Sequence, residues 1–363
     1  MGVDEATAVT VERPSRWRRI RSFPRRHKWI TLLVVLPLVL GGGALAVVAS
    51  YSGYAYHQLE EIPRFELNVG PDSERPLRPA DRTQNILLIG VDEGGGASIQ
   101  DAMQADQWKP GVFRSDSMMF LHLPEDRKSA DLISIPRDSY VPIPGHGTDK
   151  LNAAFSYGGP ALLAKTVENL TGVYVDHVAV IDFSGFADLT TELGGVDVYV
   201  PETVRDTMRD YTWTEGWHHL EGERALWYVR MRYGLPRGDF DRVQRQQNFL
   251  RAIVDKVTRS GMVSDPVKRL QLVDQVQEFV ATDEGLDARV LGGLIQSSRK
   301  LRADDVLVAT VPYTGTPTID GASVVTLDMD ATKRMFAAVV DERLEKWLQR
   351  NDVDQLPKRD DVL

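Results

Sequence analysis

Four short polar stretches interrupt a sequence that is otherwise rich in apolar, strand-like runs, and together they carry many arginines beside a few aspartates. They are Arg114-Ser115-Asp116, Pro136-Arg137-Asp138, Arg230-Met231-Arg232 and the stretch from Gly238 to Gln247. Guanidinium groups bind phosphate oxygens in a fixed geometry, and a carboxylate among them suits a divalent cation that also contacts phosphate. The residue types therefore predict a site that binds a pyrophosphate.

Acidic and basic side chains follow two strand-like runs, at the point where each run ends. Asp92 follows the apolar run 85–91, and Arg137 with Asp138 follows the run 131–135. In an open α/β sheet, ligands bind beyond the carboxyl ends of the strands. We therefore expect these three side chains to lie at one edge of a sheet.

Two further pairs are spaced two residues apart. Arg114 and Asp116 precede a predicted strand, and Arg230 and Arg232 follow the run 225–229, which is also expected to be extended. Side chains alternate in extended backbone, so the members of each pair share a face. Each pair is thus expected to reach one anion.

A helix is predicted to begin close to Asp239. Its first turns contain Arg242, Arg245 and Gln246, which offsets of three and four place on one stripe. A phosphate near this helix start would also be attracted by the positive end of the helix dipole. Each arginine taken alone is equally explained as a surface residue or a structural ion pair. Their joint placement at the ends of apolar runs favours a binding site.

The charge distribution separates the N-terminus from the rest of the chain. The 363 residues carry a formal charge of −9, whereas residues 1–28 contain eight Lys or Arg against three Asp or Glu, so the remainder carries −14. An acidic body argues against a general binder of nucleic acid or anionic lipid. Phosphate recognition must then come from a local arginine cluster.

Residues 29–50 contain no charged side chain and are long enough to cross a bilayer as a transmembrane helix. The basic flank predicts a cytoplasmic segment 1–28 and an extracytoplasmic remainder, which makes the chain a single-pass protein of the cell membrane. A cleaved signal peptide is the alternative, because Ala44-Leu45-Ala46 resembles a cleavage site. The chain has no cysteine, which excludes disulfides, a thiol nucleophile and a thiolate metal site.

The rest of the chain is predicted to form one domain. Proline-rich residues 51–81 are expected to be an extracytoplasmic linker, 82–350 the catalytic domain and 351–363 a flexible tail. Strands and helices alternate, which predicts a single α/β/α sandwich around a central, mostly parallel or mixed sheet. Residues 206–220 break the pattern as an excursion or lid. One helix is expected to start near residue 152, and further helices are expected over residues 160–170, 184–193, 242–259, 266–281, 288–301 and 331–349.

Six ordered motifs resemble the LytR-CpsA-Psr proteins, and together they cover about residues 82–260. They are Asn85 to Asp92, Arg114 to Met119, Ile133 to Asp138, Lys150 to Pro160, Leu193 to Val196 and Gly238 to Gln247. The resemblance implies a membrane-anchored phosphotransferase that moves a glycopolymer from a polyprenyl-pyrophosphate carrier to a peptidoglycan hydroxyl. It also implies a Mg²⁺ cofactor, a donor lipid and a peptidoglycan acceptor as partners, and no nucleic acid.

The resemblance also assigns roles to the motif residues. It implies that Asp92 and Asp116 bind Mg²⁺ and that Asp239 orients neighbouring arginines. It also implies that Asp138 either contacts the groups that bind the metal or acts as general base toward the acceptor hydroxyl. The phosphates would be bound by Arg114, Arg137, Arg230, Arg232, Arg242, Arg245 and Gln246, with Arg114 and Arg137 also catalytic. The sequence departs from the family after Asp92, because Glu93-Gly94-Gly95-Gly96 stands where many members carry an arginine two residues beyond the aspartate.

Two other functions use the same residues. A polyprenyl-pyrophosphate pyrophosphatase would replace the acceptor hydroxyl by water, and acceptor dependence distinguishes it from a transferase. A noncatalytic wall-polymer binding or regulatory membrane protein would not need intact Asp92, Asp116 and Arg137, so their presence argues against it. High usage of Ala, Arg, Asp and Val points to a GC-rich actinobacterium, for which either arabinogalactan or teichoic acid is compatible as the polymer.

Overall fold

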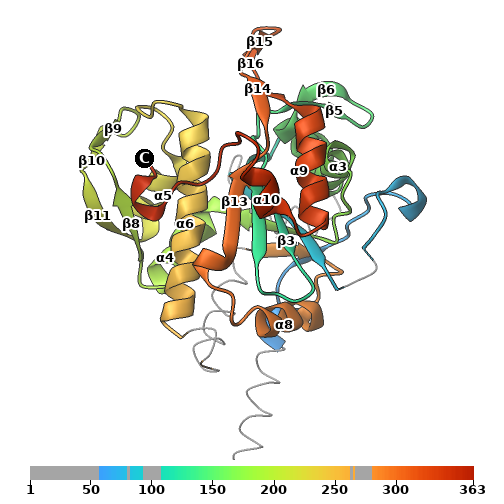
Figure 1. Cartoon of the computed structure of the whole chain (residues 1–363), viewed down its shortest axis with the longest axis horizontal. Helices are drawn as coiled ribbons and strands as arrows, with labels where there is room; N and C mark the ends of the chain where they lie inside the picture. The colour runs from blue at the N-terminus through green and yellow to red at the C-terminus, as the bar shows by residue number, and fades with distance from the viewer. Residues whose placement is uncertain (1–56, 80–81, 93–107, 262–264, 266–279) are drawn as a thin grey trace, which may run out of the picture. The chain divides into compact units, whose positions relative to one another are not determined.

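The computed structural model describes residues 57–79, 82–92, 108–261, 265 and 280–363 (Figure 1). The predicted cytoplasmic segment and transmembrane helix lie outside these residues, as do most of the expected helix 266–281 and the loop after Asp92. No helix within the described ranges has both the length and the apolarity that a membrane span requires.

A seven-stranded mixed sheet forms the centre of the domain, with strand order β1-β12-β7-β2-β3-β4-β13. The pairs β1–β12, β7–β2 and β4–β13 are parallel, and the pairs β12–β7, β2–β3 and β3–β4 are antiparallel. The strands are β1 (Arg64–Phe65), β2 (Gln84–Asp92), β3 (Arg114–Leu123), β4 (Ala130–Ser134), β7 (His177–Asp182), β12 (Val280–Asp283) and β13 (Val306–Thr310). The predicted α/β domain around a mixed sheet is confirmed.

Helices pack against both faces of this sheet, which explains why β2 is apolar almost throughout. Leu87 and Ile89 belong to the large core shared with α3 (Leu151–Thr171) and α9 (Met329–Val340). Ile86 and the neighbouring Leu88 pack instead with Leu294 of α8 (Ala288–Ser297). Because side chains alternate along a strand, a strand covered on both faces needs apolar residues at consecutive positions.

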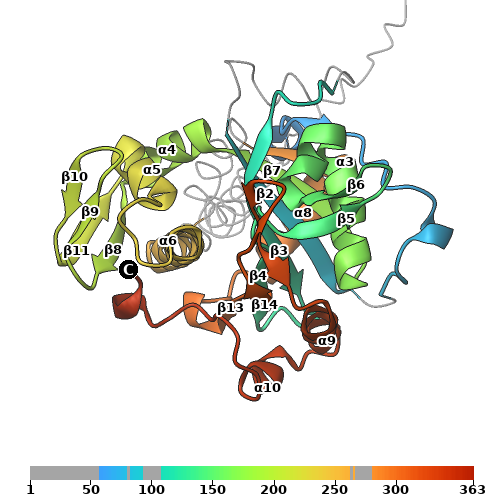
Figure 2. The same ribbon diagram turned by 90° about the horizontal axis from the view of Figure 1, so that it is seen from above.

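A second core lies beside the sheet, on the side away from α3 and α9 (Figure 2). It contains Trp213, Tyr228 and Phe249, all fully buried. The helices there are α4 (Phe183–Glu192), α5 (Gly222–Arg230) and α6 (Asp239–Arg259). The short strands are β8 (Val196–Val200), β9 (Val204–Asp206), β10 (Tyr211–Trp213) and β11 (Gly216–Leu220), so the expected excursion at 206–220 forms two antiparallel ribbons with β8 and β9.

Helix α3 is kinked where the sequence reads Gly158-Gly159-Pro160. Both glycines have non-helical backbone angles, and Gly159 has a φ of 64°. Proline lacks the N–H that would continue the helix, and glycine tolerates the left-handed conformation. The two predicted helical segments are therefore one helix with a break, and Gly172 ends it in the left-handed conformation.

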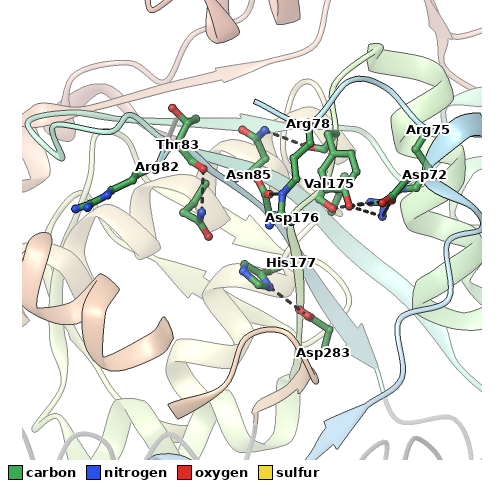
Figure 3. Close-up of polar contacts among 12 residues, drawn as sticks. Asp72, Arg75, Arg78, Arg82, Thr83, Asn85, Val175, Asp176, His177 and Asp283 are labelled. Carbon is green, nitrogen blue, oxygen red and sulfur yellow. Dashed lines mark hydrogen bonds and ion pairs between the residues drawn. The ribbon is translucent and has the colours of Figure 1, made fainter. Parts of the chain in front are cut away.

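Residues 57–79 pack onto the domain, which differs from the linker predicted over 51–81. Arg75 donates to Glu168 of α3, with 2.6 Å between Nη2 and Oε1. Figure 3 shows its second contact, in which Arg75 donates to the Val175 carbonyl at 2.8 Å. Its guanidinium also lies 3.7 Å from the centre of the Tyr174 ring. β1 extends the sheet through β12. The proline content of this segment reflects its irregular path over the surface, not separation from the domain.

The C-terminal residues also differ from the flexible tail predicted over 351–363. The backbone of Leu356 donates to Val308 of β13 at 3.0 Å, and Thr310 donates to Asp354 at 2.8 Å. Val362 is fully buried. These residues cover the outer edge of β13 instead of extending into solvent.

Three local predictions were wrong. Residues 225–230 form helix α5, not a strand, so Arg230 and Arg232 are not related by strand alternation. Val280 and Ala281 belong to β12, where the sequence predicted the end of a helix. The predicted helix 331–349 is divided into α9 and α10 (Leu344–Leu348) at Glu342, which has a φ of 53°.

Among the described residues, the remaining short elements are three two-stranded pairs and three single turns of 3₁₀ helix. The hairpin strands are β5 (Tyr140–Ile143) with β6 (Gly147–Lys150), and β15 (Thr318–Ile319) with β16 (Ala322–Ser323), while β14 (Tyr313–Gly315) pairs with β17 (Thr326–Leu327). The 3₁₀ turns are η2 (Asp72–Glu74), η3 (Ala303–Asp305) and η4 (Arg359–Asp361). Of these elements, the β5–β6 hairpin contributes to the site because it leads directly into α3.

Candidate active site

A cavity of about 810 Å³ opens where β3, the loop after β4 and the start of α3 meet. Its lining combines charged side chains with small and polar ones: Gly111, Val112, Arg114, Asp116, Arg137, Asp138, Lys150, Asn152, Ala153, Ser156 and Tyr157. Four predicted site residues, Arg114, Asp116, Arg137 and Asp138, therefore share one cavity. The lining is too polar for a purely apolar ligand.

A β-bulge in β3 positions Asp116. Gly90 of β2 pairs with Ser117 and Val91 pairs with Ser115, which leaves Asp116 without a partner across the ladder. Bulges are common beside active sites because they redirect a side chain. Arg114 and Asp116 do reach one cavity, as predicted, although the bulge interrupts the regular alternation on which that prediction rested.

Asp92 is the last residue of β2 and pairs with Arg114 across the strands. The prediction that Asp92 belongs to the site is consistent with this backbone position. Its side chain and the Glu93 loop lie outside the described residues, so its role as a metal ligand stays a prediction.

The loop that carries Arg137 is fixed by the first turn of α3. The Asn152 N–H donates to the Arg137 carbonyl at 3.0 Å, and the Leu151 N–H donates to the Ser139 carbonyl at 2.8 Å. The Ser139 hydroxyl closes the turn by donating to the Pro136 carbonyl at 2.7 Å. Helix N-termini have backbone donors without internal partners, and here two of these donors hold the loop that carries Arg137.

Arg137 is the centre of an ion-pair cluster that joins three chain segments. Its guanidinium contacts the Asp116 carboxylate, and it lies 3.8 Å from both Asp138 Oδ2 and Asp239 Oδ1. Burial alone lowers the pKa of Arg137, but the carboxylates of Asp116, Asp239 and Asp138 outweigh it and raise that pKa above its ordinary value. Arg137 is therefore held as a cation inside the protein.

Asp239 and Arg242 extend the cluster onto α6. Arg242 Nη2 lies 2.9 Å from Asp239 Oδ1 and 3.5 Å from the Asp116 carbonyl oxygen. Burial lowers the pKa of Arg242, Asp239 raises it, and the nearby Arg137 lowers it further. Because Asp239 contacts both arginines, the prediction that it orients them agrees with the geometry.

Two buried guanidinium nitrogens of this cluster suit an anionic ligand. Within the part of the chain that the structure describes, Nε of Arg137 and Nε of Arg242 have no hydrogen-bond acceptor. A buried donor without an acceptor costs about 1–3 kcal/mol, so such groups call for a functional explanation. Phosphate oxygens supply the acceptors that both guanidinium groups need.

Arg230 and Arg232 approach the cluster from the end of α5. Arg232 lies close enough to Arg242 for its charge to lower the Arg242 pKa, and its Nη2 donates to the Tyr233 hydroxyl at 2.7 Å. Arg230 is the last residue of the helix and is partly exposed. Neither arginine lines the cavity, and of the two only Arg232 is placed near the cluster, through its effect on the Arg242 pKa.

Arg245 and Gln246 lie away from this cluster. Arg245 is fully buried, donates to the Leu363 carbonyl at 2.7 Å and packs 4.6 Å from the centre of the Tyr228 ring. Gln246 donates to the Val229 carbonyl at 3.3 Å. The three residues do lie on one stripe of α6, but only Arg242, on the first turn, is beside the cavity. Arg245 and Gln246 are three and four residues later, which places them about 5 Å further along the helix axis.

Sequence reasoning missed Lys150. Its Nζ lies 2.9 Å from Asp138 Oδ1, which places an additional cation in the cavity. Asn152 and Tyr157 also line the cavity without having been given a role. All three belong to the Lys150–Pro160 motif. The position of this motif, where a hairpin leads into a helix, is the sequence feature that could have revealed them.

The carboxylates of the site are compatible with magnesium. Mg²⁺ is usually bound by one or two carboxylates together with substrate phosphates and water. The Asp116 side chain is 19% exposed, so a cation entering the cavity can reach it. No group of three or more potential metal-ligating side chains occurs among the described residues. The site therefore suits a cation that the substrate helps to bind, not a preformed metal cage.

The chain has relatives in cell-wall synthesis. Residues 55–340 match the sequence model of the LytR_cpsA_psr family. The chain is 34% identical to the probable cell wall biosynthesis protein LcpB of Corynebacterium glutamicum, over 70% of this chain and 60% of that protein. It is 35% identical to TagT of Bacillus subtilis, a polyisoprenyl-teichoic acid–peptidoglycan teichoic acid transferase, over 64% of this chain and 73% of that protein. The chain thus spans less than two thirds of the length of LcpB.

Solved structures have the same fold. TagV of Bacillus subtilis superposes with a TM-score of 0.59 at 26% identity, covering 74% of this chain and 99% of TagV. TagT with bound octaprenyl pyrophosphate lipid gives a TM-score of 0.55 at 26% identity, covering 77% of this chain and 99% of TagT. A structure of TagT bound to LI-WTA gives 0.58 at 27% identity, with the same coverage.

Proposed function

The chain belongs to the LytR_cpsA_psr family, and we propose that it is a phosphotransferase that moves a glycopolymer from a polyprenyl-pyrophosphate carrier to a peptidoglycan hydroxyl. The observation that carries this proposal is the Arg137 cluster, in which two buried guanidinium nitrogens have no acceptor within the described residues. The names of the relatives support the reaction class, and the lipid bound to TagT supports the carrier.

The donor pyrophosphate binds across the cluster. Arg114, Arg137 and Arg242 contact its nonbridging oxygens, and Arg230 and Arg232 lie on the side of the second phosphate. Negative charge increases on these oxygens as the bond between the phosphates breaks, so preorganised guanidinium donors stabilise the transition state. Asp116 and Asp239 keep Arg137 in position before the donor arrives.

The acceptor hydroxyl attacks the phosphorus on the sugar side. A new P–O bond forms to the acceptor, the bond to the bridging oxygen breaks, and polyprenyl phosphate leaves with that oxygen. Asp138 lies in the same cavity and is the candidate acceptor for the hydroxyl proton. Lys150, 2.9 Å from Asp138, adds positive charge beside the reacting phosphate. No protein nucleophile is required.

Asp116, with Asp92 at the adjoining strand end, is proposed to hold Mg²⁺ between protein and pyrophosphate. When bound, the ion neutralises charge on the nonbridging oxygens. The test is to remove divalent cations from the full chain with a chelator, measure transfer, and restore Mg²⁺. Transfer that continues at an unchanged rate in the chelator would exclude this cofactor.

The predicted topology follows from residues 1–50 and is proposed with the function. A transmembrane helix at 29–50 with a cytoplasmic basic flank places the site outside the cell membrane, where peptidoglycan lies. Protease treatment of intact cells tests it. Cleavage after residue 50 with protection of residues 1–28 is expected.

The central test uses a lipid-pyrophosphate-linked saccharide and peptidoglycan fragments. Arg137→Ala is expected to lower turnover by at least about a hundredfold, which is the typical effect of losing one preorganised transition-state donor. Arg205→Ala is the matched control, because Arg205 is 67% exposed and pairs with Asp210 outside the cluster. Equal transfer by both variants refutes the assignment, whereas donor cleavage without acceptor dependence identifies a pyrophosphatase.

A further inference from the structure

An aromatic side chain forms part of the rim of the cavity. Tyr157 lines the cavity and is 37% exposed. Its hydroxyl donates to Asp149 Oδ2 at 2.7 Å, and one face of its ring stacks on His146, with 4.6 Å between ring centroids and 14° between planes. The exposure belongs to the part of the ring that His146 leaves uncovered. The arrangement presents a fixed aromatic surface to whatever enters the cavity.

The backbone around Tyr157 explains why it is fixed. Tyr157 is the last residue of α3 before the kink at Gly158, and His146 and Asp149 come from the β5–β6 hairpin that precedes the helix. The hydrogen bond to Asp149 also raises the pKa of Tyr157, so the phenol stays protonated at neutral pH. A side chain that is already ordered loses little entropy when a ligand binds.

Strand β6 connects this aromatic group to the chemistry of the cavity. Asp149 and Lys150 are consecutive residues, so their side chains point in opposite directions. Asp149 binds Tyr157, while Lys150 Nζ lies 2.9 Å from Asp138, the candidate proton acceptor. Tyr157, Lys150 and Asp138 line the same cavity, so a ligand packed on Tyr157 occupies the cavity that also contains Asp138.

The lining between these two points suits a neutral, polyhydroxylated ring. Asn152 and Ser156 line the same cavity as Tyr157. Ser156 Oγ accepts from the Gly111 N–H at 3.1 Å, which leaves its own proton to donate. An aromatic surface with adjacent amide and hydroxyl groups matches a pyranose, which has an apolar C–H face and hydroxyls around its edge.

We propose that Tyr157, held by Asp149 and His146, forms a subsite that binds a pyranose ring of the acceptor saccharide. This inference rests on the proposed function, because it assigns the acceptor to the Asp138 side of the arginine cluster. The donor polymer also contains sugars, so the experiment must separate the two. The acceptor is favoured because its hydroxyl must reach the proton acceptor, and Asp138 lines the same cavity as Tyr157.

The experiment compares Tyr157→Ala with the unchanged full chain in detergent. Binding of a soluble peptidoglycan glycan disaccharide is measured calorimetrically without donor, and acceptor KM and acceptor-independent donor cleavage are measured separately. We expect disaccharide binding to weaken and acceptor KM to rise at least tenfold, while donor cleavage changes less than twofold. Tyr157→Phe keeps the ring and loses only the hydrogen bond to Asp149, so an intermediate effect of a few-fold is expected.

Two results would overturn the inference. Unchanged disaccharide binding in Tyr157→Ala means that the ring is not part of an acceptor subsite. Weakened donor cleavage with an unchanged acceptor KM means that Tyr157 contacts a sugar of the donor instead. Failure of the proposed function itself is recognised separately, because the unchanged protein would then not transfer the donor to the acceptor, whether or not it cleaves the donor. Thermal unfolding of both variants verifies that they are folded.

Discussion

Replacing Arg75 tests whether residues 57–79 are part of the folded domain or a linker to it. Arg75→Ala leaves the carboxylate of Glu168, which is 2% exposed, without the cation that contacts it at 2.6 Å. Removing one partner of a buried ion pair typically costs about 3–5 kcal/mol. Glu168 still accepts from the Val175 N–H at 2.8 Å, so we expect the lower end of this range, about 3 kcal/mol.

Arg78→Ala is the matched control, because it removes the same side-chain type from the same segment. Arg78 Nε lies 3.0 Å from Asp176 Oδ1, but the Arg78 side chain is 60% exposed. Asp176 is itself only 2% exposed, but solvent screens the exposed Arg78 guanidinium, so the pair is expected to contribute about 1 kcal/mol, the upper end for exposed pairs. The carboxylate of Asp176 also retains the Asn85 N–H as a donor.

The assay is thermal unfolding followed by circular dichroism. For a domain of this size, about 1 kcal/mol corresponds to roughly 2 °C in Tm. Arg75→Ala is therefore expected to lower Tm by about 6 °C, and Arg78→Ala by no more than about 2 °C. If Arg75→Ala lowers Tm no more than Arg78→Ala does, the segment does not unfold with the domain and the reasoning is wrong.

Three further predictions concern the core and the arginine cluster. Burial and then the nearby Glu342 raise the pKa of Asp131 to about 7, so the folded state retains a proton that the unfolded state loses between about pH 4 and pH 7. The contribution of Asp131 to the free energy of unfolding therefore falls as pH rises through that window, by up to about 4 kcal/mol. Asp131→Asn should remove this pH dependence. Gly159→Ala should lower Tm more than Gly172→Ala does, because both positions have φ near 70° but only Gly159 has a neighbouring side chain, 3.1 Å from the added Cβ. Arg245→Met should change turnover less than about threefold, whereas Arg242→Met should lower it at least about a hundredfold.

Each of these predictions has a result that contradicts it. Unfolding curves between pH 4 and pH 8 that are parallel for Asp131→Asn and the unchanged protein exclude the raised pKa. Equal Tm values for the two glycine variants mean that the contact at the α3 kink is not tight. If Arg245→Met lowers turnover as much as Arg242→Met does, Arg245 belongs to the phosphate-binding site after all.

The central strands could be predicted because burial on both faces leaves a strong sequence signal. In β2, consecutive residues from Ile86 to Ile89 are apolar. The alternation of strands and helices around this run was enough to predict a mixed sheet. The short segment 225–230 was assigned wrongly because an apolar run of this length fits a strand and a helix turn equally well. Tertiary packing against α6 decides that it is helical.

The site was predicted only in part, for reasons that differ between residues. Arg137 and Asp138 follow a strand end, which the topology of α/β sheets links to ligand binding. Asp116 depends on a bulge, and sequence does not reveal the residue at which a ladder slips. Lys150 acts through a hairpin that returns to the loop after β4, a contact between segments whose pairing is set by the fold. Arg245 was misassigned because a helical stripe fixes direction but not distance along the axis.

The charge balance of the cluster explains why a substrate-borne cation belongs to the proposed reaction. Arg137 and Arg242 are matched by Asp116 and Asp239, and Lys150 is matched by Asp138, so the paired groups are nearly neutral together. Such pairing keeps buried guanidinium groups charged and oriented without a ligand, but it also reduces their attraction for a dianion. A pyrophosphate that enters with a divalent cation carries little net charge, so the carboxylates then attract the cation while the guanidinium donors contact the phosphate oxygens. In the proposed reaction, the aspartates that hold the arginines in place would therefore also favour a metal-bound substrate.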